Sequence, residues 1–212
     1  MATLTTDSPL TEPAPVPVPE APPAGDPAIL GLPIFVVGSI ALGLSLVGYV
    51  PASAAGAIVP IIFAATGLGL VMATVWAASL AQTMVACIFG LFAGFWISFA
   101  ILDLALFHNW LLIPATAVTK SVGLFLISWA IVMAALTLAT LRLPVAFTAV
   151  IALVVLALIL RTFGVLDAST GLSTAAGYVV FVFAALGIYL FLGAADVATG
   201  GQGLPLGPPL RR

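Results

Sequence analysis

Long runs of apolar residues follow one another along the chain, and short breaks containing proline or polar residues separate them. Six runs are long enough to cross a bilayer, since a membrane helix needs about 20 apolar residues. Each run is continuously apolar, whereas the strands of a membrane barrel alternate apolar and polar residues. Backbone polar groups in lipid must be satisfied within each segment, so the pattern predicts an all-α membrane protein with six transmembrane helices. The predicted spans are 29–50, 54–77, 84–107, 121–141, 145–163 and 175–194.

Both ends of the chain break this pattern. The first 27 residues hold 8 of the 16 prolines, several acids and no Lys or Arg. Such a stretch is typical of disordered or polyproline-like sequence. The predicted organisation is therefore a disordered Pro/Ala-rich tail over 1–25, a six-helix transporter domain over 26–194 and a C-terminal tail over 195–212. The glycines and prolines of residues 200–212 exclude a helix there.

The first span has a well-defined predicted start at Asp26-Pro27. An aspartate side chain can accept hydrogen bonds from the free N–H groups at the start of a helix, and proline fits the first helical position. We therefore expect the apolar run to become helical directly after these two residues.

Charge is too scarce for a water-soluble domain. Only 6% of the residues are charged and 63% are hydrophobic, whereas about a quarter of the residues of soluble domains are charged. Between Pro27 and Thr119 the one formal charge is Asp103. The chain is therefore predicted to be a multi-pass membrane protein surrounded by lipid. The net charge of −2 excludes a nucleic-acid partner, which needs a basic surface.

The residues needed for catalysis or metal binding are missing from the sequence. The chain has one histidine, His108, and one cysteine, Cys87, so neither a nucleophile with a neighbouring base nor a set of metal ligands is indicated. No glycine-rich phosphate loop or dinucleotide motif is present either. We predict no enzyme activity, no metal and no cofactor, and these absences favour a solute pathway.

A few polar residues near the span ends are candidates for that pathway. Gln82 and Thr83 precede span three and are predicted to form a polar mouth. Asp103 lies one turn from the end of span three, and an acid inside a membrane helix is a candidate for a proton-linked role. Arg161 ends the predicted span five and is expected to extend towards the headgroups. With no arginine mid-span, any anion is expected to bind weakly and transiently.

The opening of span one resembles a known signature. Asp26-Pro-Ala-Ile-Leu-Gly-Leu32 is similar to the Asn-Pro-Ala-Pro-Leu-Gly-Leu motif of the acetate uptake transporter family, also called the GPR1/FUN34/YaaH family, and Pro27, Leu30, Gly31 and Leu32 match it. Further similarity covers Gln82-Thr83, Phe95-Trp96, Trp129, Thr140-Leu-Arg142, Gly187-Ile-Tyr-Leu190 and Leu204-Pro-Leu-Gly207.

This resemblance implies a function as well as a fold. Members have six helices and their own pathway in each subunit, and the bacterial members form a hexameric ring. They transport acetate and small carboxylates, succinate in some members, by proton coupling or a channel-like route. Acetate or another small carboxylate as substrate and a homo-hexamer in the plasma membrane are thus the expectations for this chain.

The resemblance also implies a hydrophobic constriction made by a Phe, a Tyr and a Leu. These positions fall on Phe35, Phe92 and Leu153, with Val154 as the alternative for the last because the preceding turn differs in length. Phe92 replaces the Tyr, and Asp26 replaces the Asn of the signature. Without the hydroxyl the constriction is fully apolar, which favours a neutral, protonated acid over a bare anion because desolvating a charge costs far more.

Orientation and two alternative functions complete the sequence predictions. The basic residues that would share a side with the termini, Arg142, Arg211 and Arg212, outnumber Lys120 and Arg161. By the positive-inside rule both termini are predicted to be cytoplasmic. The alternatives to carboxylate transport are a passive conduit for another small solute, such as ammonia, and a membrane scaffold subunit that conducts nothing.

Overall fold

The computed structural model describes residues 25–211 and is all-helical apart from its turns and its C-terminal segment. Six helices are long and apolar enough to cross a membrane, which confirms the predicted six-span fold. The prediction of a disordered tail over 1–25 falls, except for Gly25, outside the described residues. The elements are α1 (Ala28–Leu46), η1 (Ala52–Ile58), η2 (Ile61–Leu68), α2 (Gly69–Ser79), α3 (Thr83–Phe107), α4 (Ala115–Ala139), α5 (Val145–Leu166) and α6 (Thr170–Ala198).

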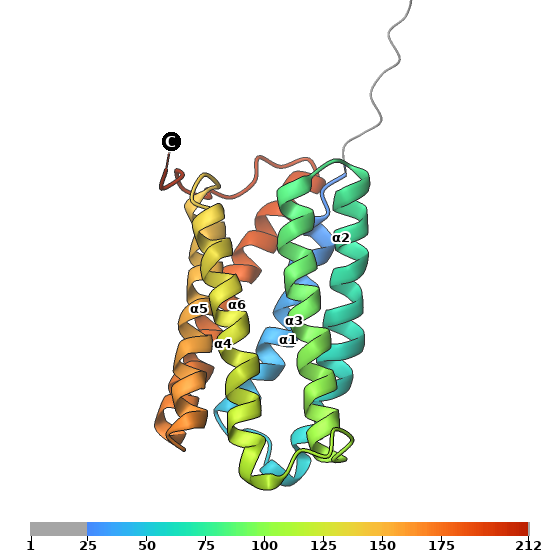
Figure 1. Cartoon of the computed structure of the whole chain (residues 1–212). Coiled ribbons are helices and arrows are strands. Elements are labelled where there is room, and N and C mark those ends of the chain that lie inside the picture. Colours follow the sequence, from blue (N-terminus) through green and yellow to red (C-terminus); the bar gives the residue numbers. More distant parts are fainter. Residues whose placement is uncertain (1–24, 212) are drawn as a thin grey trace, which may run out of the picture.

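The helices pack side by side as a bundle, with the start of the described chain and the C-terminus at the same end (Figure 1). This end is called the tail end below, and the other end, where α1, α3 and α5 finish, is called the far end. Close contacts join α1 to α6, α6 to α5, α5 to α4, and α2 to α3. Helices α3 and α4 meet mainly through aromatic rings, such as Phe95 and Trp129, whose ring centres lie 5.6 Å apart.

The second span is continuous but changes its winding. It runs over Ser53–Ser79, beginning as a 3₁₀-helix, widening to a π-helix over Ile61–Leu68 and continuing as an α-helix. Pro60 directly precedes the wide segment. Proline lacks an N–H and its ring collides with the preceding turn, so a local change of winding at this position has an identifiable cause.

Two helices, α4 and α6, begin earlier than the hydropathy pattern predicts, and α5 continues past its predicted end at Phe163 to Leu166. Helix α4 begins at Ala115 rather than Ser121, directly after the extended Pro114, and thereby includes Lys120, whose long side chain can place its charge in the headgroups. Helix α6 begins at Thr170 rather than Ala175. The hydroxyl of Ser169 accepts a hydrogen bond from the Leu172 N–H at 3.3 Å and so caps this earlier start.

Helix α6 continues to Ala198, four residues into the predicted C-terminal tail. The remaining segment, 200–211, is non-helical, as predicted, and lies across the turn between α4 and α5. The Arg211 N–H donates to the Leu141 carbonyl at 2.9 Å, and the Ala146 N–H donates to the Leu206 carbonyl at 3.1 Å. The Tyr189 hydroxyl on α6 donates to a second carbonyl of the segment, that of Pro205, at 2.6 Å. These bonds hold the segment against the tail end of the bundle.

Candidate functional site

Two internal cavities lie one after the other along the bundle. The central cavity, of about 220 Å³, lies between α1, α3, α4, α5 and α6. The tail-end cavity, of about 180 Å³, lies nearer the tail end, where α1, α3 and α5 begin and α6 finishes. Both are lined mostly by apolar side chains. Together they extend along much of the membrane-spanning part of the molecule.

Phe35 and Phe92 line both cavities and therefore separate them. Their ring centres lie 4.8 Å apart with the planes tilted by 59°. Phe183 of α6 stacks on Phe35 at 5.7 Å. All three side chains are almost completely buried, at 3–4% exposure. The three rings, Phe35 with Phe92 and Phe183, are called the aromatic neck below, and their side chains carry no polar atom.

Leu153, the third residue expected at the constriction, lies in the lining of neither cavity. Val154 lines the central cavity and is buried, whereas Leu153 is partly buried and packs against other core side chains. The cavity-facing positions of α5 recur three or four residues apart, as one face of a helix requires. They are Phe147, Val150, Ile151, Val154, Ala157, Leu158 and Arg161. Leu153 does not lie on this face of the helix. The alternative position, Val154, is the one that lines the central cavity.

The signature residues at the start of α1 form the wall of the tail-end cavity and support it. Asp26 and Leu32 line the cavity, and Leu30 packs against the core. Pro27 and Gly31 are buried. Gly31 lies directly against the Phe89 ring, which leaves no room for a side chain at that position.

Asp26 caps α1 as the sequence predicts. Its Oδ1 atom accepts a hydrogen bond from the Ala28 N–H at 2.9 Å. We expect Asp26→Ala to lower the free energy of unfolding by about 1 kcal/mol, because an N–H group at the helix start loses its partner. Asp26→Asn keeps an accepting oxygen and should unfold at the wild-type temperature. Thermal unfolding of the two variants in detergent checks this, and equal losses in both would contradict the capping role.

Gln82 and Thr83, predicted as a polar mouth, lie at the tail end, where Gln82 precedes α3 and Thr83 is its first residue. The Gln82 side chain donates a hydrogen bond to the Gly25 carbonyl at 3.2 Å, and the Thr83 side chain is exposed. Neither is part of the lining of the tail-end cavity. The observed contact of Gln82 therefore fastens the segment that leads into α1.

A second group of polar side chains lines a hollow at the far end. A wide vestibule of about 580 Å³ opens there between the end of α1 and the turn from α5 to α6, and it shares Ser45, Leu46, Ala55 and Arg161 with the central cavity. Hydroxyl groups supply much of its polarity. They belong to Ser45, Ser169, Thr170, Ser173 and Thr174.

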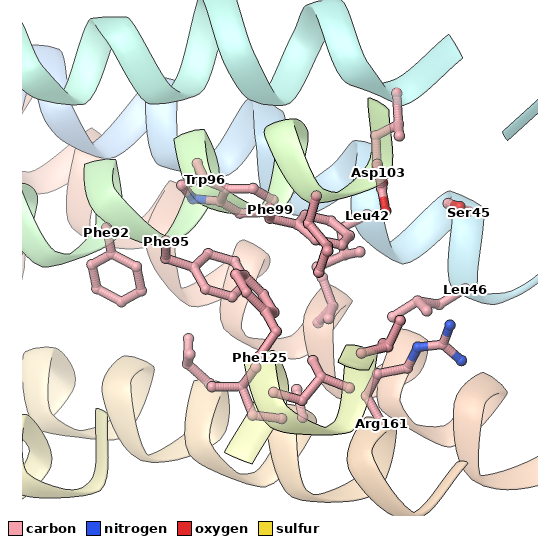
Figure 2. A pocket seen from close by; sticks show the side chains of 18 of the residues that line it. Leu42, Ser45, Leu46, Phe92, Phe95, Trp96, Phe99, Asp103, Phe125 and Arg161 are labelled. Carbon is pink, nitrogen blue, oxygen red and sulfur yellow. The ribbon is translucent and has the colours of Figure 1, made fainter. Parts of the chain in front are cut away.

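The central cavity carries two charged residues, Asp103 of α3 and Arg161 of α5. Figure 2 shows both at one end of the cavity, with Phe92 at the other. Helix α5 continues to Leu166, so Arg161 lies more than a turn inside the helix rather than at its end. Its Nη1 donates to the Ser173 hydroxyl of α6 at 2.7 Å. The expectation that Arg161 extends towards the headgroups stays a prediction, and the observed partner of its side chain is Ser173.

Other polar atoms of the spans are mostly satisfied locally. The hydroxyls of Ser39, Ser98 and Thr162 donate to carbonyls one turn earlier in their own helices. Trp96 lines the central cavity, and its indole nitrogen is buried without a partner. Within residues 25–211 no group of three or more His, Cys, Asp or Glu residues is arranged to hold a metal ion.

Sequence reasoning missed Phe183 and the role of Arg161. Phe183 is one of many aromatic residues in apolar runs, and nothing in the local sequence marks it as the neighbour of Phe35. Arg161 carried a usable signal, because a charge close to an apolar run is rare. Its nearness to Asp103 depends on helix packing, which the sequence pattern does not give.

Comparison with known proteins adds two matches. A family model, described as the GPR1/FUN34/yaaH family, matches residues 11–202. Among solved structures, one described as the structure of the bacterial acetate channel SatP superposes with a TM-score of 0.76 at 23% sequence identity. The match covers 86% of this chain and 99% of the other. A search of curated proteins found no match. At this identity the structural match establishes a shared fold.

Proposed function

The chain belongs to the GPR1/FUN34/yaaH family, and on this premise we propose that it transports acetate or a similar small monocarboxylate across a membrane. The observation that carries the proposal is the aromatic neck between two cavities. Such an arrangement provides room for a small solute on both sides of one short apolar barrier. The fold shared with a bacterial acetate channel supports the choice of substrate.

The proposed route begins in the vestibule and ends in the tail-end cavity. A solute passes Ser45 and Arg161 into the central cavity, since these residues line both spaces. It then crosses between Phe35 and Phe92 into the tail-end cavity, where Asp26 lies. The route runs within one subunit. It puts polar groups at the two ends and leaves the middle apolar.

The apolar neck favours passage of the protonated acid. A bare carboxylate would lose its hydration without gaining a hydrogen bond, because the three rings of the neck offer no donor. The cost of moving an unpaired charge into such surroundings far exceeds that of a neutral polar group. We therefore propose that acetic acid crosses the neck, accompanied by its proton.

Acetate uptake into proteoliposomes should depend strongly on pH. Simple carboxyl groups titrate near pH 4, so between pH 5 and pH 8 the neutral fraction falls by several hundredfold. Protein-dependent uptake of labelled acetate, after subtraction of protein-free liposomes, is expected to fall by at least about tenfold over this range. Methanesulfonate, which is similar in size but stays ionised, should not cross at either pH.

Each possible failure of this experiment has its own meaning. Equal protein-dependent rates at pH 5 and pH 8, or passage of methanesulfonate, would contradict the neutral-acid route. No protein-dependent acetate uptake at any pH would contradict carboxylate transport itself. Ammonia is the second candidate solute, because an uncharged molecule of that size also suits an apolar neck. Absence of flux for both solutes would favour the scaffold function.

We propose that the protein lies in the plasma membrane as a homo-hexamer with both termini in the cytoplasm, and that it acts as a transporter rather than an enzyme. Large apolar side chains on the outer faces of α2 and α4 support contact with lipid or with further subunits. Met72, Leu124 and Leu138 are each 64–70% exposed in the single subunit. A chemical-crosslinking ladder that stops at the monomer would contradict the hexamer.

A further inference from the structure

The two charged residues of the central cavity have no part in the aromatic neck. Asp103 and Arg161 come from different helices, yet both line the same end of the cavity. Figure 2 shows them there on opposite walls, with Ser45 nearby. Every residue between them and the neck is apolar or aromatic. A carboxylate that moves from the vestibule towards the neck therefore passes charged side chains only here, beside Asp103 and Arg161.

We propose that Arg161 forms a carboxylate-binding site at the junction of the vestibule and the central cavity, and that Asp103 weakens this site so that bound substrate leaves quickly. The inference rests on the proposed transport function and adds to it the residues that recognise the substrate. The ligand is a small monocarboxylate in its ionised form, held until it takes a proton from a hydronium ion in the water of the vestibule. The neutral acid formed in this way then leaves Arg161 and crosses the neck.

Arg161 is held in position but retains free donors. One nitrogen, Nη1, donates to the Ser173 hydroxyl at 2.7 Å, and that hydroxyl donates in turn to the Ser169 carbonyl at 3.2 Å. These two hydrogen bonds hold the guanidinium of Arg161 against α6. A guanidinium has five N–H donors in a planar fork that matches the two oxygens of a carboxylate. Within the described part of the chain the bond to Ser173 is the one hydrogen bond that Arg161 makes.

Asp103 faces the same space without neutralising Arg161 by direct contact. Within residues 25–211 its carboxylate makes no hydrogen bond or close ion pair, although the two charges lie within electrostatic range of each other. A direct pair would occupy the guanidinium and exclude a substrate. A negative charge at a greater distance instead repels a bound carboxylate moderately, since the interaction falls with distance. Fast conduction requires such weak binding.

The proposal predicts opposite effects for the two residues. Arg161→Gln should raise the acetate concentration for half-maximal uptake at least about tenfold, because a charge-assisted hydrogen bond is lost. Asp103→Asn, which keeps the size of the side chain, should lower that concentration roughly fivefold, because the repulsion is removed. Arg142→Gln is the matched control. Arg142 is exposed in the turn before α5 and lies outside the three cavity linings, so this variant should behave as wild type.

The experiment measures both transport and binding on the full chain. Concentration-dependent uptake of labelled acetate in proteoliposomes measures transport. Titration of detergent-solubilised protein with sodium acetate, followed by calorimetry or by ligand NMR, measures the affinity for acetate. Arg161→Lys, which keeps the charge but loses the fork, should lie between wild type and Arg161→Gln. If Arg161→Gln does not fold, the tighter binding expected for Asp103→Asn still tests the proposal.

Two results would contradict the proposed carboxylate-binding site at Arg161. Unchanged acetate affinity in Arg161→Gln would show that the guanidinium does not bind substrate. Weaker binding in both Arg161→Gln and Asp103→Asn would show that the two residues act together as a structural pair. Both results can occur with normal wild-type uptake, which leaves the proposed transport function standing. Conversely, acetate binding that depends on Arg161 in a protein that takes up no acetate would contradict transport alone.

Discussion

Acetate uptake by a Phe92→Trp variant is expected to fall about a hundredfold. Phe92 is 4% exposed and lies between the two cavities, with its ring centre 4.8 Å from that of Phe35. Phe183 stacks on the far side of this pair, so a larger ring has no free space to enter except the passage itself. Moving a solute past the larger ring should raise the barrier to passage by about 3 kcal/mol, comparable to the cost of inserting extra atoms into a packed core, and each 1.4 kcal/mol corresponds to about a tenfold change in rate.

The matched control is Phe163→Trp on α5. Phe163 is 52% exposed and lies outside the linings of both cavities, so the same change of side chain should leave uptake near the wild-type rate. Phe92→Ala should have the reverse effect, raising uptake and admitting larger acids, because the barrier is shortened. Wild-type uptake in Phe92→Trp, together with a folded protein on size-exclusion chromatography, would show that solute does not pass this neck.

The sequence alone supports the fold more firmly than the pathway. Six apolar runs determine six helices, because lipid allows little other secondary structure. The constriction is different, since a Phe that lines a passage and a Phe that fills a core have the same local pattern. Phe35 and Phe92 could be named only through the resemblance to a known family. Phe183, which stacks on Phe35, had no such support and was missed.

The third predicted constriction position shows how a shift of one residue changes a side chain's surroundings. Successive residues of a helix point about 100° apart, so moving from Leu153 to Val154 turns the side chain from the surrounding packing towards the central cavity. The turn that ends at Pro144 sets the register of α5. The sequence therefore predicted which helix and which helical turn carry this residue, but it left Leu153 and Val154 as two candidates for the position.

Charged residues were easier to notice than to interpret. Asp103 was a candidate from the sequence because it is the one formal charge in a long apolar stretch. The extent of α5 beyond Phe163 was not predicted, so Arg161 was assigned to the helix end. The structure places both residues on the same cavity. Contacts between α3 and α5 are long-range in sequence, and hydropathy carries no information about which helices become neighbours.

Close packing of α1 against α6 should be the most sensitive structural feature of the bundle. A side chain at Gly177 would meet the Gly43 carbonyl at 3.2 Å, Leu46 at 3.0 Å and Val47 at 2.8 Å. The Gly43 carbonyl is a backbone atom and cannot move away by a change of side-chain rotamer. Small residues that allow two helices to approach closely are a main source of helix association in lipid. The packing of α1 also positions Phe35, so damage at Gly177 should reach the neck.

We therefore expect Gly177→Leu to lower the free energy of unfolding by about 3 kcal/mol, at the upper end of the range for overpacking, and to abolish acetate uptake. Gly171→Leu is the control on the same helix, because its nearest neighbour, the Ser169 hydroxyl, lies 4.0 Å from the added carbon. Thermal unfolding in detergent and uptake in proteoliposomes measure the two effects. Similar stability losses in both variants would mean that the cost comes from placing leucine in α6 generally, and that the α1–α6 contact does not limit the fold.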